Sequence, residues 1–138
     1  MSEPGRNLPQ MAAETCLKWL RWADEDLILA RHVVADDELV ARGACVWAHQ
    51  AAEKSLKALL VHRNVDPPKL HDLDRLAQRL PDDEGKLFAH IELPELTRWA
   101  IDGRYPGDLD EARTADARKA ISIASQVLEV VRLRIRDR

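Results

Sequence analysis

Residues that can bind an anion or exchange a proton gather in one segment of this 138-residue chain, Trp47 to Leu60 (WAHQAAEKSLKALL). Its alanines and leucines recur every three or four positions, which predicts a helix with one buried face. At about 100° per residue, the polar positions fall beside one another on another part of the surface. These polar candidates are His49, at the border with the apolar stripe, Gln50, Glu53, Lys54 and Lys57. Such a row can hold and orient a bound anion.

The same spacing also suits ordinary helix chemistry. Glu53 and Lys57 are four residues apart with the acid first, as in exposed ion pairs that stabilise a helix by about 0.3–0.5 kcal/mol. A histidine beside an apolar stripe, such as His49, more often makes a packing hydrogen bond than takes part in chemistry. On the pattern of this helix alone, a solvated surface pair is the commoner interpretation and an anion site is the alternative.

Two further segments carry candidates that would have to reach this helix from elsewhere in the chain. His71 and Asp72 open a short predicted helix, where Asp72 can cap the first turn and His71 can project beside the preceding helix. Arg104 and Tyr105 precede Pro106 and offer a guanidinium fork and a phenol, which suit recognition of phosphate and base. An Arg-Tyr pair before proline is also common in loops, so it gains meaning only in combination with the other segments.

The composition argues against several classes of protein. A net charge of -3 is unlike that of a basic nucleic-acid coat protein, although a local cationic patch remains compatible with it. Cys16 and Cys45 lie inside helical patterns without metal-type spacing, so we expect buried, reduced thiols, no metal site and no cofactor. No apolar stretch approaches the roughly 20 residues of a membrane span, and the first ten residues lack the apolar core of a signal peptide. We therefore expect a cytoplasmic protein that makes no membrane contact.

Long amphipathic segments must position these candidates. Helices are predicted over residues 9–34, 38–64, 70–80 and 94–101, and a weak helix is expected over residues 84–91. A last helix is predicted from Asp108, its cap, to the C terminus, with Glu111 in capping-box position. Amphipathic helices of similar length with short connections pack as a bundle. We predict an all-α fold, an antiparallel up-and-down bundle of four to five helices. Residues 9–138 would form this single domain, and residues 1–8 a flexible tail.

Three sequence blocks together resemble a known family. The run AHQAAEKSLKALLVHRNVDPPKLHDLDRL is followed by LTRWAIDGRYP and a final alanine-rich helix. This succession is similar to the HEPN family (higher eukaryotes and prokaryotes nucleotide-binding) over about Cys16 to Val131. The most specific parts are the HQAAEKxLKALL block, PPxxHDL at Pro67–Leu73, and RYP. The resemblance implies a helical bundle that usually dimerises and binds nucleotide or RNA. The resemblance also implies a partner, because prokaryotic members of the family are often encoded beside a minimal nucleotidyltransferase as a toxin-antitoxin pair.

The resemblance is incomplete at the ribonuclease motif of the family, an Arg followed after a few residues by a His. Arg104 matches the Arg, but Leu109, Asp110 and Glu111 occupy the positions where the His should fall. A carboxylate can act as a base but cannot replace imidazole in both directions of proton transfer near neutral pH. Arg42 and His49 satisfy the spacing in the wrong helix, a match that a chain rich in arginine gives by chance.

The leading hypothesis is therefore an HEPN-like module that binds a nucleotide or RNA, forms a homodimer and pairs with a nucleotidyltransferase partner protein. Phosphate would contact Lys54, Lys57 and Arg104; a base or sugar would contact Tyr105 or His71; Gln50 and Glu53 would orient these groups, and His49 and Asp72 would line the same groove. No residue is assigned a catalytic role.

Two alternatives differ in what the same face does. The first is a metal-independent ribonuclease with a non-standard site, using His49 or His71 beside Arg104. The second is a protein-protein interaction subunit that needs no small ligand. Exposed apolar residues such as Trp22, Trp47 or Trp99 would favour this second alternative.

Overall fold

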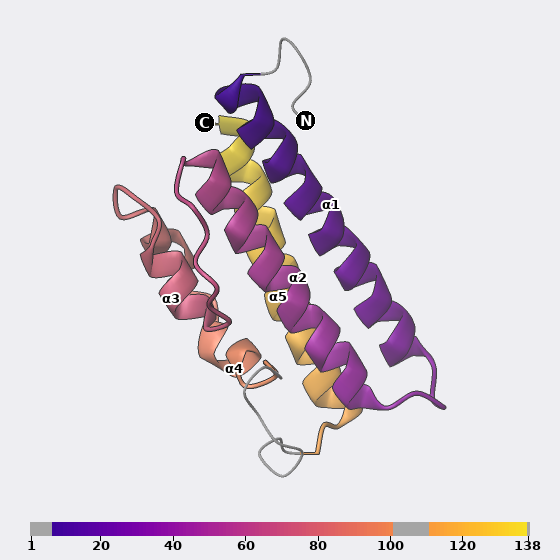
Figure 1. Ribbon diagram of the computed structural model, residues 1–138. Coiled ribbons are helices and arrows are strands. Elements are labelled where there is room, and N and C mark those ends of the chain that lie inside the picture. The colour runs from indigo at the N-terminus through magenta and orange to yellow at the C-terminus, as the bar shows by residue number, and fades with distance from the viewer. Residues whose placement is uncertain (1–6, 101–110, 138) are drawn as a thin grey trace.

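Three long helices form the body of the computed structural model, which describes residues 7–100 and 111–137 (Figure 1). They are α1 (Leu8–Ala35), α2 (Ala41–His62) and α5 (Thr114–Asp137). Between α2 and α5 lie three short elements, α3 (Leu73–Gln78), the 3₁₀ helix η1 (Glu84–Phe88) and α4 (Leu93–Thr97). In Figure 1, α1 and α2 run in opposite directions, while α5 lies behind α2 and runs the same way as α2. The short elements return the chain to the start of α5, so they take the place of a fourth long helix between α2 and α5. The predicted all-α bundle is confirmed.

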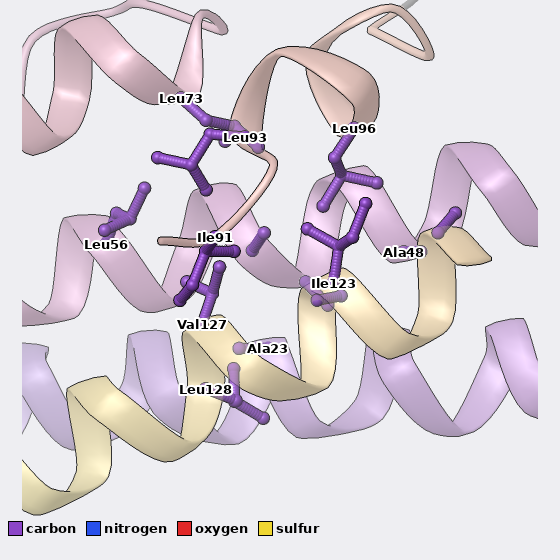
Figure 2. Packing of buried hydrophobic residues seen from close by; sticks show 14 of the residues in the cluster. Ala23, Ala48, Leu56, Leu73, Ile91, Leu93, Leu96, Ile123, Val127 and Leu128 are labelled. Atoms are coloured by element: carbon purple, nitrogen blue, oxygen red, sulfur yellow. The ribbon is translucent and has the colours of Figure 1, made fainter. Parts of the chain in front are cut away.

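The core is built around α2, which is buried on nearly every side. Its alanines Ala44, Ala48, Ala51 and Ala52 are fully buried and let the neighbouring helices approach closely because they add so little volume. From the short elements, Leu73, Leu93 and Leu96 point toward α2 and α5, where they meet side chains such as Leu56 and Ile123 (Figure 2). The predicted apolar stripe of this helix is thus confirmed, but the rest of its surface is also covered.

Local side-chain hydrogen bonds set the helix starts and explain where the predicted bounds differ. Asn7 caps α1 through a reciprocal capping box with Gln10, so the helix begins at Leu8. The amide of Glu38 donates to Asp36 Oδ1 over 2.9 Å, which holds a turn and delays α2 to Ala41 instead of residue 38. Asn64, at φ 63°, follows α2 in the left-handed conformation that asparagine tolerates.

Helices α3 and α5 also begin after their predicted positions. Asp72 Oδ1 accepts from the Arg75 amide at 3.2 Å, so α3 starts at Leu73 instead of residue 70. The carboxylate of Asp116 accepts from the Arg113 amide at 2.8 Å. Helix α5 therefore begins at Thr114, and the expected capping role of Glu111 is wrong because Glu111 precedes the helix. Asp108, the expected cap, lies outside the described residues.

A buried carboxylate joins the ends of α2 and α5 to η1. Glu84 Oε1 and Oε2 accept from Arg63 Nε at 2.7 Å and Nη2 at 2.6 Å, and Arg134 Nε donates to Oε2 over 2.7 Å. The Arg63 guanidinium holds the pKa of Glu84 below its usual range of about 4.5, against the opposing effect of burial. The neighbouring Gly85 has to be glycine, because a Cβ there would lie 2.4 Å from the Ala77 carbonyl oxygen. We call Glu84, Arg63 and Arg134 the Glu84 cluster.

Both cysteines lie in the interior of the bundle. Cys16 and Cys45 are buried and unbridged, as predicted, and burial raises the pKa of the Cys45 thiol to about 11. Among the helices in residues 7–100 and 111–137, none is both long and apolar enough to cross a membrane.

Candidate functional site

Glu53 and Lys57 lie at the centre of a hydrogen-bonded network between α2 and the segment that leads to α3. Lys57 Nζ donates to Glu53 Oε2 over 3.1 Å, and His71 Nδ1 donates to Glu53 Oε1 over 2.8 Å. The side chains of Glu53 and Lys57 are only 6% and 10% exposed. The interpretation of this pair as a solvated surface ion pair is therefore wrong. The sequence pattern misses the burial because the chain beyond α2 folds back over the polar face.

His71 is held at two points. Its ring binds Glu53, and its backbone carbonyl accepts from His49 Nε2 over 2.8 Å. The carbonyl can only accept, so His49 carries a proton on Nε2. The side chain of His71 is 38% exposed, in contrast to Glu53 beneath it. The structure thus confirms that His71 projects beside α2, and we call Glu53, Lys57 and His71 the Glu53 network.

His49 itself is fully buried. Its hydrogen bond to the His71 carbonyl fixes the loop against α2, which is the packing role expected of a histidine at the edge of an apolar stripe. A ring without solvent exposure does not reach a substrate. The chance match of Arg42 with His49 is therefore no active site.

Lys54 points to a different neighbour from the Glu53 network. Its Nζ donates to Asp26 Oδ2 of α1 over 2.5 Å, and the two side chains are 21% and 7% exposed. Burial raises the pKa of Asp26, although the hydrogen bond and charge of Lys54 counteract the shift. The expected phosphate contact of Lys54 therefore has to compete with this ion pair, whose main structural effect is to join α1 to α2.

A hollow of about 760 Å³ opens beside Lys57. Its first wall is the start of α1, including Met11 and Ala12, and its second is the segment from Asn64 to Lys69. Trp19, Lys57 and Val61 also line it. The Lys57 ammonium lies 5.8 Å from the centre of the Trp19 ring, within range of a cation-π interaction. We call this space the Lys57 hollow. Sequence reasoning missed it, because Trp19 belongs to the apolar stripe predicted for another helix.

The remaining candidates separate into three groups. Asp72 caps α3, which is the structural role considered for it, and Gln50 is half-buried on α2. Arg104 and Tyr105 lie outside the described residues. The structure therefore brings together Glu53, Lys57 and His71, with His49 behind them.

The exposed tryptophans expected of an interaction subunit are found in part. Trp22 and Trp47 are 38% and 36% exposed, but Trp99 is only 3% exposed. Trp99 packs in the hydrophobic core, and the Arg98 guanidinium lies over its ring at 4.7 Å. For Trp99 the expected exposure is wrong, because the turn after α4 brings its indole inward.

The sequence matches the model of the HEPN domain over residues 16–134. The chain belongs to the HEPN family. Its fold is similar to the crystal structure of ST0689, an archaeal HEPN homologue, with a TM-score of 0.67 and 24% sequence identity; the match covers 87% of this chain and 97% of that chain. It is also similar to TT1696 from Thermus thermophilus, with a TM-score of 0.68 and 27% identity, covering 85% of this chain and 95% of that chain. No curated protein matches the sequence.

The family resemblance drawn from the HQAAEKxLKALL, PPxxHDL and RYP blocks is thus confirmed. In this HEPN protein the first two blocks meet in space, because the PPxxHDL segment supplies His71 to the Glu53 of the first block. The described part of the chain shows no grouping of three or more His, Cys, Asp or Glu side chains suited to a metal ion.

Proposed function

We propose that this HEPN protein binds a nucleotide or single-stranded RNA through a phosphate group beside the Glu53 network. The observation that carries the proposal is the buried Glu53–Lys57 pair, with the partly exposed His71 ring bound to the same carboxylate. Burying two charges costs several kcal/mol, and a buried ion pair often adds little net stability. Charged groups held in this way beside a hollow are typical of binding sites.

The chemistry of the network suits an anionic partner with hydrogen-bonding groups. Lys57 lines the Lys57 hollow and supplies an ammonium held in place by Glu53. The exposed Lys69 also lines this space. His71 presents a partly exposed ring close to Glu53 and can contact a base or a ribose. Arg104 and Tyr105 are proposed to complete the site with a phosphate contact and a stacking or hydrogen-bonding group.

A mobility-shift assay with 5′-labelled single-stranded RNA, together with calorimetric titration of nucleotides, tests this function. Lys57→Met keeps most of the apolar stem but removes the charge, and we expect it to weaken binding about tenfold, the equivalent of roughly one charge-assisted contact. Arg104→Ala should weaken binding while leaving the helical circular dichroism signal intact. Lys86→Met is the matched control, because the Lys86 side chain is 80% exposed and lies on η1. Unchanged affinity in both site variants would refute the proposal.

The same assay distinguishes binding from cleavage. The Glu53–His71 hydrogen bond orients an imidazole in the way that a catalytic carboxylate does, which favours a non-standard ribonuclease as a second candidate. RNA incubated in EDTA should then be cut by the wild type and left intact by His71→Asn. If neither protein cuts the RNA, the cleavage candidate is refuted and the binding function is retained.

We also propose that the face shared by α1 and α5 joins a second copy of this chain, in keeping with the dimers of the family. A groove of about 640 Å³ there includes Ile28 and Leu133, which are 54% and 47% exposed. Charges of both signs border these residues, among them Asp24, paired with Arg132, and Glu129. Mixed charges around an apolar centre suit an isologous contact between identical surfaces.

Light scattering during size-exclusion chromatography tests the dimer. The wild type should elute with twice the mass of one chain, and Ile28→Glu should elute as a monomer. Leu87→Glu is the control, because Leu87 is 40% exposed on η1 and does not line the groove. Co-expression with a minimal nucleotidyltransferase tests the proposed toxin-antitoxin partner separately, and failure of the two chains to co-purify would count against it.

A further inference from the structure

We infer that the Lys57 hollow is a binding site for one nucleoside monophosphate, with the base in its apolar part and the phosphate at Lys57 and Lys69. The inference rests on the proposed function and specifies its ligand and place. It concerns the space between the start of α1 and the segment that follows α2.

The size of the hollow fits one small ligand. Its volume of about 760 Å³ falls within the usual range of roughly 300–1,000 Å³ for small-molecule sites. It is bounded by helix α1 on one side and residues 64–69 on the other. A space of this volume is suited to one nucleotide unit.

The apolar part of the hollow suits a flat aromatic ring. Trp19 contributes an indole that is already fixed by an edge-to-face contact with Trp22, with ring centres 5.7 Å apart. Pro67 and Pro68 lie in the opposite segment, and Met11 adds a flexible, polarisable side chain. Stacking of a base on an aromatic side chain tolerates any base, because every base has a flat π-face. The hollow therefore offers stacking surface without demanding one particular base.

The charges around the hollow indicate a single phosphate. Lys57 and Lys69 line it with positive charge, whereas Asp66 lies in the same rim with negative charge. Glu53 accepts from Lys57 at 3.1 Å and adds a second carboxylate beyond it. Two ammonium groups beside two carboxylates can accommodate one phosphate, but the repulsion would grow with every phosphate added. An uncharged apolar ligand, by contrast, would leave the Lys57 ammonium facing a non-polar surface.

Calorimetric titration with defined probes tests the ligand class. Adenosine 5′-monophosphate and guanosine 5′-monophosphate should both bind. Adenosine should bind at least about tenfold more weakly, because it loses the charge-assisted contacts. Inorganic phosphate should give no heat of binding, and adenosine triphosphate should bind more weakly than the monophosphate. Tighter binding of octanoate or of adenosine triphosphate than of the monophosphates would overturn the ligand assignment.

A pair of neighbouring substitutions tests the place. Ala12 lines the hollow, and Ala13 is exposed and does not line it. Ala12→Trp should fill the hollow and lower the affinity for adenosine 5′-monophosphate at least tenfold, whereas Ala13→Trp should bind as the wild type does. Lys69→Met should lower affinity several-fold in comparison with Lys86→Met. Thermal unfolding of all four variants establishes that each is folded before its titration is interpreted. If Ala12→Trp does not fold, Lys69→Met still tests the place, because Lys69 is exposed.

The outcomes separate this inference from the function on which it rests. A wild-type protein that binds neither monophosphates nor RNA refutes both. Binding of RNA without binding of monophosphates refutes the inference alone. Binding of monophosphates that Ala12→Trp and Lys69→Met leave unchanged also refutes the inference alone, because the ligand then occupies another part of the HEPN bundle.

Discussion

Glu53 and Glu84 are both buried glutamates with two basic partners, yet they belong to regions of different character. Glu84 binds two arginines from the ends of α2 and α5, so three separate segments are joined by groups that are always charged. Glu53 binds a lysine of its own helix and a histidine from the following loop. The Glu53 network borders a hollow and includes a ring that is 38% exposed.

Burial of a carboxylate does not by itself identify a binding site. Both carboxylates are about equally shielded, with side chains 6% and 5% exposed. In the Glu84 cluster both carboxylate oxygens accept from guanidinium groups. The cluster is therefore a structural junction, which joins three segments of the fold. In the Glu53 network the lysine lines the Lys57 hollow, and the imidazole is 38% exposed. The partners, and the space beside them, distinguish the proposed binding site from a structural ion cluster.

The largest effect should come from breaking the Glu84 cluster. Glu84→Gln leaves the guanidinium of Arg63, whose side chain is 16% exposed, without a carboxylate to neutralise it. We expect the free energy of unfolding to fall by about 3 kcal/mol, as when one partner of a buried ion pair is removed. Urea denaturation at pH 7, followed by circular dichroism, measures this change. A loss of less than about 1 kcal/mol, the size of a single neutral hydrogen bond, would show that the cluster does not hold the three segments together.

Glu53→Gln sharpens the comparison and should be less damaging. The amide can still accept from Lys57 or His71, and water in the adjacent hollow can solvate the ammonium, so we expect a loss of about 1–2 kcal/mol. The same urea titration measures it. If this loss equalled that of Glu84→Gln, the Glu53 network would be a structural junction of the same kind, and its burial would no longer point to a binding site.

The pH dependence of stability should also test the Glu84 cluster. The pKa of Glu84 is lowered in the folded protein from a value of 4.5, so its contribution is fully present above pH 4.5 and is lost as the pH falls through the folded-state pKa. The difference in unfolding free energy between wild type and Glu84→Gln should therefore narrow below pH 4.5. Urea titrations at pH 7, 5 and 4 test this sign. A difference that widened toward low pH would contradict it.

The smallest effect is expected at an exposed carboxylate. Glu92 binds Lys119 over 2.9 Å, and the two side chains are 60% and 52% exposed. Glu92→Gln should leave the free energy of unfolding unchanged within error, because water solvates both charges well. This variant is the matched control for the two buried glutamates. A measurable loss would show that carboxylate removal is costly everywhere in this protein, and the contrast would no longer be informative.

Much of the fold was predictable because long helices have a periodic apolar pattern. The stripe of α2 and the presence of three long helices follow from apolar spacing, and the family blocks indicated the HEPN bundle. Helix starts were less predictable, since single side chains such as Asp36 and Asp116 decide them. For the site, the pattern singled out Glu53, Lys57 and His71, but it also grouped Lys54 with them, although Lys54 pairs with Asp26 of α1.

By itself, the sequence determined the helical class, the family and the polar row on α2, because each follows from residue spacing along one element. Tertiary structure alone decided that Glu53 and Lys57 are buried, that His71 binds Glu53, and that Trp19 borders the same hollow as Lys57. These facts depend on how residues far apart in the chain meet. Burial and partner choice are properties of several packed elements, and no single helix carries a pattern for them.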